Sequence, residues 1–411
     1  MQTTINMSEK TTYYLELEEK YGAHNYHPIP VVLERGEGVY VWDIDGKRYY
    51  DFLSGYSAVN QGHCHPKIVQ SFIEQLQKLT LTSRAFYNNI LGEYEKFITE
   101  YFGYDKVLPM NTGVEAVETA IKLCRKWAYE VKGIREGNAK IIVCEGNFHG
   151  RTSTVISFSN DPLARKNFGP YMPGFISIPF NDITALEKVL KDKEVAGFLF
   201  EPIQGEAGVV VPDEGYLSKA KQVCENANVL FIADEIQTGL ARTGKMLACD
   251  HENVKADILI LGKALSGGMM PVSAVLADDE IMMRINPGEH GSTYGGNPLA
   301  SKIAITSLQV LKDEKMAENA DAMGELLRSE IKKLTSSHIA TVRGKGLLNA
   351  MVIDHRNKEA AWDLCLELKE NGLLAKPTHG DKIRFAPPLV INKEQIMECV
   401  EIVRKSLLVL D

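Results

Sequence analysis

The chain has 411 residues, of which 45% are hydrophobic and 24% are charged, and its formal net charge is −8. This composition is typical of a globular protein with a large buried core, and the length favours two domains. The negative charge disfavours nucleic acid and anionic membrane surfaces as partners, because both would repel the protein at long range.

The seven cysteines are scattered and form no Cys-x-x-Cys pair, which predicts reduced thiols in a cytoplasm. The first twenty residues lack the apolar core or basic face of a targeting segment, and no stretch has the length and apolarity of a membrane span. We therefore expect a cytoplasmic protein that binds small molecules.

The first predicted element is a β-hairpin over residues 39–52, where two alternating runs flank an Asp45-Gly46 turn. From about residue 60 to 300, helical stretches alternate with short apolar runs. Those runs cover residues 140–144, 195–200, 229–233 and 258–261. Continuous apolarity predicts strands that are covered on both faces, and so an α/β fold with a mostly parallel sheet.

The C-terminal part changes character. Residues 301–336 have helical periodicity, short strands follow at 346–353 and 382–385, and a last helix begins at about Lys393. We predict a hairpin-containing N-terminal segment (1–59) that packs with a small α+β domain (301–411), and a large ligand-binding domain between them (60–300).

Chemically active side chains follow each of the four buried runs. They lie in Glu145–Arg151, Glu201–Glu206 and Asp234–Gln237, and at Lys263. Because ligands bind beyond the carboxyl ends of parallel strands, these groups predict one site.

Lys263 follows an apolar strand and precedes small or apolar residues with no carboxylate. Desolvation disfavours the ammonium form, so such an amine becomes a nucleophile suited to a Schiff base with an aldehyde. A solvated lysine at a strand end is the ordinary alternative. The carboxylate of Asp234, at the end of a neighbouring run, favours the catalytic interpretation.

Two loops could bind a phosphate. Thr112, Gly113 and Val114 open an amphipathic helix, whose free N–H groups and positive dipole end suit an anion. Ser292 and Thr293 lie in a second hydroxyl-rich loop before a helix. In both places an ordinary helix cap is the alternative.

The sequence resembles the fold type I, class III (subgroup II) pyridoxal-phosphate aminotransferases over nearly its whole length. The matching motifs are NTGVEAVETAIK, GNFHGRT, EPIQGEAG, ADEIQTGLARTG, LGKALSGG and STYGGNPLA. Within that family it is most similar to the ornithine δ-aminotransferases, through residues 22–28, 54–66 and 384–391.

The resemblance implies that pyridoxal 5'-phosphate is the cofactor, bound covalently by Lys263, which then moves a proton. Asp234 would pair with the ring nitrogen. The other implied cofactor residues are Thr112, Gly113 and Val114 at the phosphate, Phe148 and His149 at the ring, Gln237 at the phenolic oxygen, and Ser292 and Thr293. His149 departs from the animal enzymes, in which a bulky aromatic often follows the stacking phenylalanine. In the family Thr293 comes from the neighbouring subunit, which implies a homodimer.

The implied substrates are L-ornithine and 2-oxoglutarate. Arg384 would bind the α-carboxylate of 2-oxoglutarate, and Arg151 would bind the ornithine carboxylate and the distal carboxylate of the oxo acid. Glu206 would neutralise Arg384 when ornithine is bound. Tyr26 would hold the ornithine α-amine, and Tyr56 would line the same channel.

The implied reaction moves the δ-amino group of ornithine to 2-oxoglutarate by a ping-pong mechanism. Two alternatives stay open: another class III transaminase, acting on acetylornithine or 4-aminobutyrate, and a non-catalytic protein that binds a phosphorylated ligand at Thr112-Gly113.

Several other polar residues have ordinary interpretations. His63, Cys64 and His65 fall short of a four-ligand set, so we expect no metal and a turn before a helix at Pro66. Glu115 and Glu118 are expected to favour the first turn of their helix, and Arg242 and Lys245 to be solvated loop charges.

Overall fold

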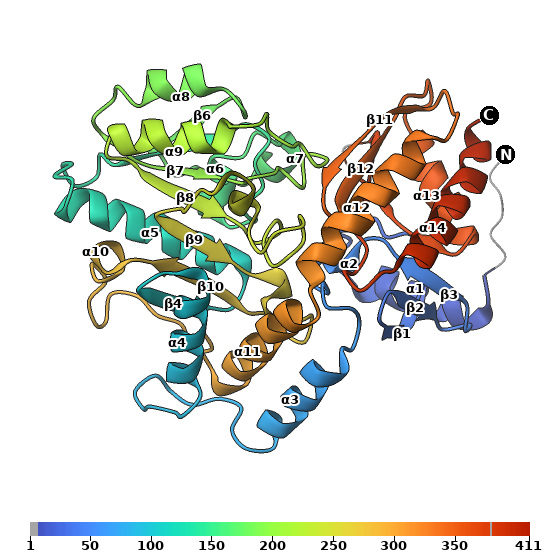
Figure 1. Ribbon diagram of the computed structural model, residues 1–411, viewed down its shortest axis with the longest axis horizontal. Coiled ribbons are helices and arrows are strands. Elements are labelled where there is room, and N and C mark those ends of the chain that lie inside the picture. The colour runs from blue at the N-terminus through green and yellow to red at the C-terminus, as the bar shows by residue number, and fades with distance from the viewer. Residues whose placement is uncertain (1–6, 379) are drawn as a thin grey trace.

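The computed structural model describes residues 7–378 and 380–411, and its elements are arranged around three sheets (Figure 1). The largest sheet has seven strands in the order β4-β10-β9-β8-β7-β5-β6. These are β4 (Lys106–Met110), β5 (Lys140–Cys144), β6 (Phe175–Ile178), β7 (Val195–Phe200), β8 (Leu230–Asp234), β9 (Ile258–Leu261) and β10 (Ser273–Ala277). Only β10 runs antiparallel to its neighbours. The predicted α/β fold with a mostly parallel sheet is therefore confirmed.

Helices cover both faces of this sheet, which explains why its strands are apolar throughout. Ile141, Leu199 and Ile232 pack with α5 (Gly113–Glu130) on one face. Their chain neighbours, including Ile142, Phe198 and Phe231, pack on the other face with α8 (Ile183–Val189) and α9 (Tyr216–Asn226). Successive side chains of a strand point to opposite faces, so a sheet covered twice needs apolar residues at every position.

Shorter helices and α11 complete this part of the molecule. They are α3 (Pro66–Leu76), α4 (Leu91–Phe102), α6 (Ser153–Ser157), α7 (Pro162–Arg165), α10 (Asp279–Met282), α11 (Pro298–Asp313) and the 3-10 helices η1 (Ala248–Glu252) and η2 (Lys263–Ser266). The helix predicted at Pro66 begins at that residue, which stands at its first position.

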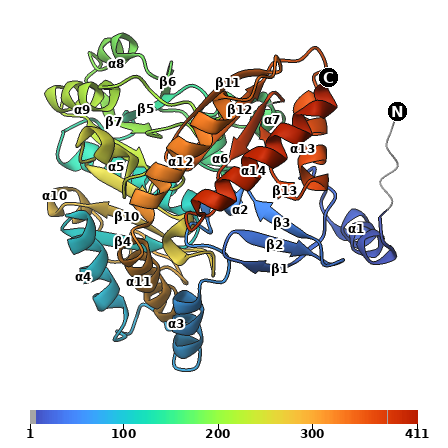
Figure 2. The same cartoon turned by 45° about the vertical axis from the view of Figure 1, so that its right-hand side comes forward.

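The N-terminal region has α1 (Glu9–Tyr21) and the strands β1 (Leu33–Glu37), β2 (Tyr40–Asp43) and β3 (Arg48–Asp51). The predicted hairpin is confirmed, because β2 and β3 pair antiparallel around Asp45-Gly46. The short strand β13 (Leu373–Leu374) pairs parallel with β3, and Figure 2 shows β1–β3 lying below β13.

The third sheet is antiparallel, in the order β11-β12-β15-β14. Its strands are β11 (Ile339–Lys345), β12 (Leu348–Ile353), β14 (Lys376–Thr378) and β15 (Lys382–Phe385), and its helices are α12 (Met316–Lys332), α13 (Ala360–Glu370), α14 (Lys393–Ser406) and η3 (Leu407–Leu410). The last helix begins at Lys393, as predicted. The predicted helical stretch 301–336 is two helices, α11 and α12, separated at Lys315 by left-handed backbone with φ 50°.

The boundaries predicted at residues 59/60 and 300/301 stay predictions. Residues 1–6 of the predicted N-terminal segment lie outside the described residues. Residue 301 falls inside α11. Among the helices of residues 7–378 and 380–411, none has both the length and the apolar composition needed to cross a membrane.

Candidate active site

A cavity of about 210 Å³ opens where β5, β7, β8 and β9 end. It is lined by Gly113, Val114, Phe148, His149, Gly150, Glu201, Glu206, Asp234, Ile236, Gln237, Thr238 and Lys263. A second cavity of about 370 Å³ shares Phe148, His149, Gly150 and Glu206 with it and adds Arg151. The four strand ends that were predicted to converge therefore do so.

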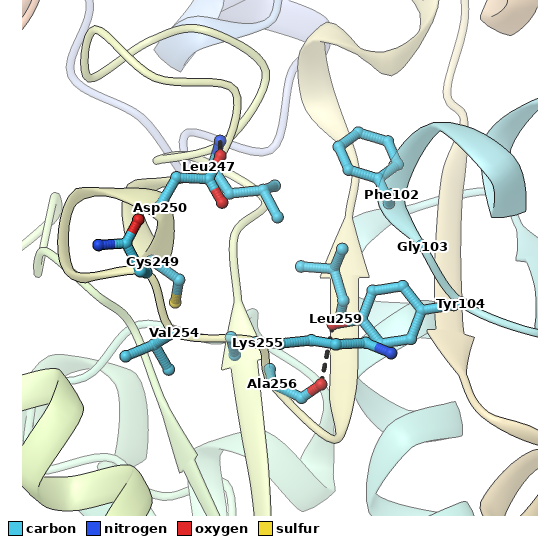
Figure 3. Close-up of a pocket in the computed structure, with 12 residues that line it drawn as sticks. Phe102, Gly103, Tyr104, Leu247, Cys249, Asp250, Val254, Lys255, Ala256 and Leu259 are labelled. Atoms are coloured by element: carbon cyan, nitrogen blue, oxygen red, sulfur yellow. Dashed lines mark hydrogen bonds between the residues drawn. The ribbon is translucent and has the colours of Figure 1, made fainter.

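Another cavity of about 330 Å³ lies between the end of α4 and the loop that leads into β9 (Figure 3). Two of its polar side chains are already paired. The hydroxyl of Tyr104 donates to the carbonyl of Ala256 at 2.8 Å, and the ammonium of Lys255 lies over the Tyr104 ring and 2.9 Å from Asp278. Burial raises the pKa of the Cys249 thiol in its lining, so this thiol stays protonated, and the cavity lacks the combination of groups that surrounds Lys263.

Lys263 stands at the start of η2, and its backbone is left-handed, with φ 45°. A non-glycine residue in that region is strained, and such strain is concentrated at functional sites. Within the described residues its ammonium makes no hydrogen bond or ion pair. Burial lowers the pKa of Lys263 to about 8, against the opposing charge of Asp234. A substantial fraction of this side chain is therefore a neutral amine near physiological pH.

Asp234 ends β8, and both of its carboxylate oxygens are engaged. Oδ1 accepts the N–H of Ile236 at 3.1 Å, and Oδ2 lies 2.7 Å from Nδ1 of His149. Burial by itself would lower the pKa of His149, but the hydrogen bond and the charge of Asp234 outweigh it and raise that pKa. The other ring nitrogen, Nε2, is buried and has no partner among the described residues. His149 thus supports the carboxylate from behind.

Glu201 directly follows β7 and lies in one of the runs predicted to converge, but no role was predicted for it. It lines the cavity, and one of its oxygens accepts the N–H of Phe148 at 2.8 Å. Burial raises the pKa of Glu201 to about 7, partly offset by the charge of His149. Its place at a strand end, beside Glu206 in the same motif, was the signal that could have identified it.

The N-terminus of α5 forms an anion cradle. The hydroxyl of Thr112 caps the helix, and the side chain of Glu115 accepts the N–H of Thr112 at 2.7 Å, which completes a capping box. Across residues 7–378 and 380–411, nothing accepts the N–H groups of Gly113 and Val114. These two groups line the cavity with the positive end of the helix dipole behind them.

Two glycines allow the close contacts that shape the cavity. A Cβ at Gly150, where φ is +123°, would lie 2.4 Å from Cγ2 of Val114, so glycine lets this loop approach the start of α5. A Cβ at Gly205 would lie 1.6 Å from Oε1 of Gln237. Side chains at either position would displace residues that line the cavity.

Arg384 projects from β15 towards the same cavity and meets an acid there. Its Nη1 lies 2.8 Å from Oε2 of Glu206, and its guanidinium carbon lies 5.0 Å from the centre of the Tyr56 ring. Its Nε is buried without a partner in the described chain. Burial raises the pKa of Tyr56, so this phenol stays neutral. The ion pair joins the third sheet to the large sheet at the rim of the site.

Tyr56 is held in place by an uncommon backbone. α2 (Ser54–Ser57) is one turn of left-handed helix, with φ values from 50° to 72°. Such backbone costs a non-glycine residue roughly 1–2 kcal/mol. The carboxylate of Asp51 accepts two N–H groups at the start of the turn, and the first serine hydroxyl donates to the carbonyl of Ala386 at 2.7 Å.

Two predicted substrate residues lie further out. The Arg151 guanidinium carbon lies 5.5 Å from the centre of the Phe148 ring and is exposed at the mouth of the second cavity. Tyr26 is 67% exposed and lines neither cavity, and its nearest cation is the ammonium of Lys376, at 5.8 Å.

Ser292 and Thr293 do not line the cavity. The hydroxyl of Ser292 accepts a hydrogen bond from Nδ2 of Asn111, at 2.8 Å, immediately before the anion cradle. Thr293 is exposed. Ser292 is therefore bonded to a residue beside the cradle, and Thr293 points to solvent.

The prediction for Arg242 is wrong. This side chain has no exposure and is bonded inside the protein, whereas Lys245 is exposed, as expected. The sequence suggested a loop charge, but the loop is covered by the third sheet. His63 and His65 each pair with a separate acid, Asp51 at 2.7 Å and Glu314 at 3.2 Å.

The residues of the cavity fit the cofactor that the sequence resemblance implies. A neutral amine, an anion cradle with two free N–H groups, an aromatic ring and a buried carboxylate surround one space. Asp234 and Glu201 make the space polar beyond the ends of β7 and β8. A phosphorylated aromatic aldehyde needs this combination of groups.

Comparison with known proteins identifies the same chemistry. The profile of the family described as aminotransferase class-III matches residues 21–407. The mitochondrial ornithine aminotransferase of Rattus norvegicus is 63% identical over 96% of this chain and 90% of its own length. A crystal structure of acetylornithine aminotransferase from Elizabethkingia anophelis is 62% identical, with a TM-score of 0.89 over 97% of this chain and 99% of that one. An ornithine aminotransferase structure from Toxoplasma gondii, with partial occupancy of PLP at its active site, is 48% identical, with a TM-score of 0.95 over 97% and 94%.

The lowered pKa of Lys263 predicts selective reactivity. In cofactor-free protein, an amine-reactive probe should label Lys263 half-maximally at about pH 8, because the neutral amine reacts. Site-resolved mass spectrometry measures the labelling, with the exposed Lys219 as the internal reference. Labelling of Lys263 that rises only in parallel with Lys219 would contradict the desolvated amine.

Proposed function

This chain belongs to the class-III aminotransferase family, and from that premise we propose that it moves the δ-amino group of L-ornithine to 2-oxoglutarate. The products are glutamate 5-semialdehyde, which cyclises to pyrroline-5-carboxylate, and L-glutamate. Enzymes of this family use pyridoxal 5'-phosphate. The observation that carries the proposal is the ion pair between Glu206 and Arg384 at the rim of the cavity that holds Lys263.

The ion pair accounts for two different substrates in one pocket. Ornithine presents its side-chain amine to Lys263 and has a single carboxylate, which Arg151 binds at the outer cavity. Arg384 then faces no carboxylate, and Glu206 neutralises it. 2-Oxoglutarate has a carboxylate at each end, so Glu206 releases Arg384, and the two guanidinium groups bind the two carboxylates as bidentate pairs.

When bound, the cofactor supplies an electron sink for the electrons released as the substrate C–H bond breaks. Gly113 and Val114 would hold its phosphate, Phe148 its ring face, and Gln237 its phenolic oxygen. Asp234, supported by His149, would hold a proton at the ring nitrogen. Nζ of Lys263 would take the proton from the substrate carbon and return it, because a neutral amine is the base available there.

Acetylornithine is the second candidate donor, since the Elizabethkingia anophelis protein of that name is 62% identical to this chain. The two donors differ at the α-nitrogen, which is a cation in ornithine and a neutral amide in acetylornithine. The groups proposed to meet that nitrogen are Tyr56 and Tyr26, neither of which lines either of the two cavities. Tyr56 lies on the Arg384 guanidinium, while Tyr26 is exposed and free to bind a substrate ammonium.

A panel of amine donors tests the proposal. Ornithine, acetylornithine, 4-aminobutyrate and glutamate are each mixed with the loaded enzyme, and the loss of the cofactor's visible band is followed in single turnover. Ornithine should react with the highest kcat/KM, and Lys263→Ala should remove turnover with all donors while the far-UV circular dichroism is unchanged. A higher kcat/KM for acetylornithine would reject ornithine as the donor, and normal turnover by Lys263→Ala would reject the mechanism.

Removing the acid of the ion pair should change donor preference. In Glu206→Gln, Arg384 is uncompensated, so kcat/KM for ornithine should fall and that for glutamate should rise, each roughly tenfold, or about 1.4 kcal/mol. Glu187→Gln, at an exposed position on α8, is the control and should leave both values unchanged. An unchanged ratio of the two donors in Glu206→Gln would reject the gate.

We also propose that the enzyme is a homodimer in which Thr293 of one subunit completes the phosphate site of the other. Thr293 is exposed, and so are aromatic residues in its own loop and in the segment around Arg84. Tyr294 is 56% exposed, and Phe86 and Tyr87 are 69% and 105% exposed. A Cβ at Gly296 would lie 3.0 Å from Nη1 of Arg84, which brings the two segments into contact at that point. Large exposed aromatic side chains are typical of a subunit interface.

Subunit complementation tests the dimer. Lys263→Ala and Thr293→Asp variants, the second of which places a carboxylate against the phosphate, should each be nearly inactive. Co-expressed with different tags and purified by both, the mixed dimer should regain about half of the wild-type activity, because one of its two sites is intact. A mixed dimer as inactive as its parents would mean that Thr293 acts within its own subunit.

A cytoplasmic location is part of the proposal. It is supported by the seven free cysteines, six of which are buried. The relative from Rattus norvegicus is named mitochondrial.

A further inference from the structure

Arg242 is a buried guanidinium in the loop that follows β8, and it is the largest side chain that is fully buried within the described chain. It donates four hydrogen bonds, all to neutral oxygens. Nε and Nη2 bond to Oδ1 of Asn60 at 3.1 and 2.5 Å, and Nη1 bonds to the carbonyls of Leu347 and Pro387 at 3.0 and 2.6 Å.

Burying this guanidinium lowers the stability of the fold. In residues 7–378 and 380–411, no carboxylate forms an ion pair with Arg242, and Asp51, whose charge acts on it, is already bonded to His63. Burial lowers the pKa of Arg242 to about 9, so the group keeps its charge at neutral pH. A buried charge without a counterion costs several kcal/mol, and an apolar side chain would fill the space at lower cost. The need to fill space in the core therefore does not explain why an arginine stands at this position.

The bonds of Arg242 join three separate parts of the chain. Leu347 directly precedes β12, and Pro387 follows β15, which carries Arg384. In the sheet, Ala350 pairs with Arg384, so β12 and β15 are neighbouring strands at this point. A single guanidinium thus ties the ends of two adjacent strands of the third sheet to the loop after β8.

Asn60 connects the third part, the segment that follows the left-handed turn of Tyr56. Its Nδ2 donates to the carbonyl of Leu240 at 2.8 Å, and its own carbonyl accepts the N–H of Leu389 at 2.8 Å. The N–H of Leu347 donates back to the carbonyl of Arg242 at 3.1 Å. Each of these segments is hydrogen-bonded to at least one of the others, which restricts their movement relative to one another.

We propose that Arg242 is a positioning residue for Arg384. It fixes β15 and the Tyr56 segment against the edge of the large sheet where Lys263 lies, and so sets the distance between the two guanidinium groups that bind a dicarboxylate. Because the inference builds on the proposed function, its effect is specific to one substrate. Arg384 faces a carboxylate of 2-oxoglutarate or of its product glutamate, whereas ornithine uses Arg151.

The test is Arg242→Lys, which keeps the charge but has three donors on one nitrogen and cannot span the same acceptors. Calorimetry on the loaded enzyme compares glutarate, an unreactive dicarboxylate, with pentanoate, which has one carboxylate. Glutarate should bind about tenfold more weakly to the variant, and pentanoate within about twofold of wild type. In single turnover, the KM for 2-oxoglutarate should rise about tenfold, while the ornithine half-reaction is unchanged within about twofold.

Arg328→Lys is the matched control. Arg328 lies on α12 and donates to the carbonyl of Gly346 and to Oδ1 of Asn349, both at 2.8 Å, so it holds the same loop from within the third sheet's own helices. Its replacement should lower the melting temperature and leave the ratio of glutarate to pentanoate affinity unchanged.

Equal losses for glutarate and pentanoate in Arg242→Lys, or the same selective loss in Arg328→Lys, would overturn the inference. If Arg242→Lys does not fold, Asn60→Ala decides by the same ratio, since it removes the acceptor of two of the four bonds. Failure of the proposed function gives a different result. The wild-type enzyme would not react with ornithine, while the ratio of glutarate to pentanoate affinity would still show whether Arg242 positions Arg384.

Discussion

An amine such as that of Lys263 can act as a base only while it is both desolvated and unpaired, and these conditions conflict in a protein interior, where a buried ammonium attracts a carboxylate. The conflict is resolved because the nearby carboxylates are already bonded to other groups. Asp234, whose charge opposes the lowered pKa of Lys263, is bonded to His149 and to a backbone N–H. Glu206 is bonded to Arg384. Burial then dominates, and the pKa of Lys263 falls to about 8.

The groups that would bind the negative charges of ligands, in contrast, are not paired with acids of the protein. Gly113 and Val114 keep free N–H groups for an anion, and Arg151 has an exposed guanidinium without an acid among the described residues. Arg384 differs, because its acid is only partly buried and can move away. Arg384 itself is buried, so its charge needs a counterion in both half-reactions, and a substrate carboxylate would replace Glu206 in that role. On the proposed roles, dual specificity requires the rotation of one side chain and no rebuilding of the pocket.

Much of this was predictable from local sequence. Strands covered on both faces are apolar at every position, so β5, β7, β8 and β9 were identified, and with them the edge where Lys263, Asp234 and Phe148 meet. β4, β6 and β10 were not identified, since polar, small or proline residues interrupt their apolar runs. The left-handed turn at Tyr56 has no strong sequence signal, because three of its four residues are not glycine and its φ angles are imposed by Asp51 and Ala386.

Arg242 shows the limit of local reasoning most clearly. Its neighbours, Thr-Gly-Lys, describe an exposed loop, and only contacts with residues more than a hundred positions away bury it. The spacing between Arg151 and Arg384 has the same character. One guanidinium follows β5 in the large sheet and the other stands on β15 in the third sheet, so no segment of sequence encodes the distance between them. On the proposed roles of the two arginines, selection of a dicarboxylate over a monocarboxylate depends on how rigidly the two sheets are joined, and Arg242, which stands in the loop after β8 and bonds to the ends of two strands of the third sheet, joins them.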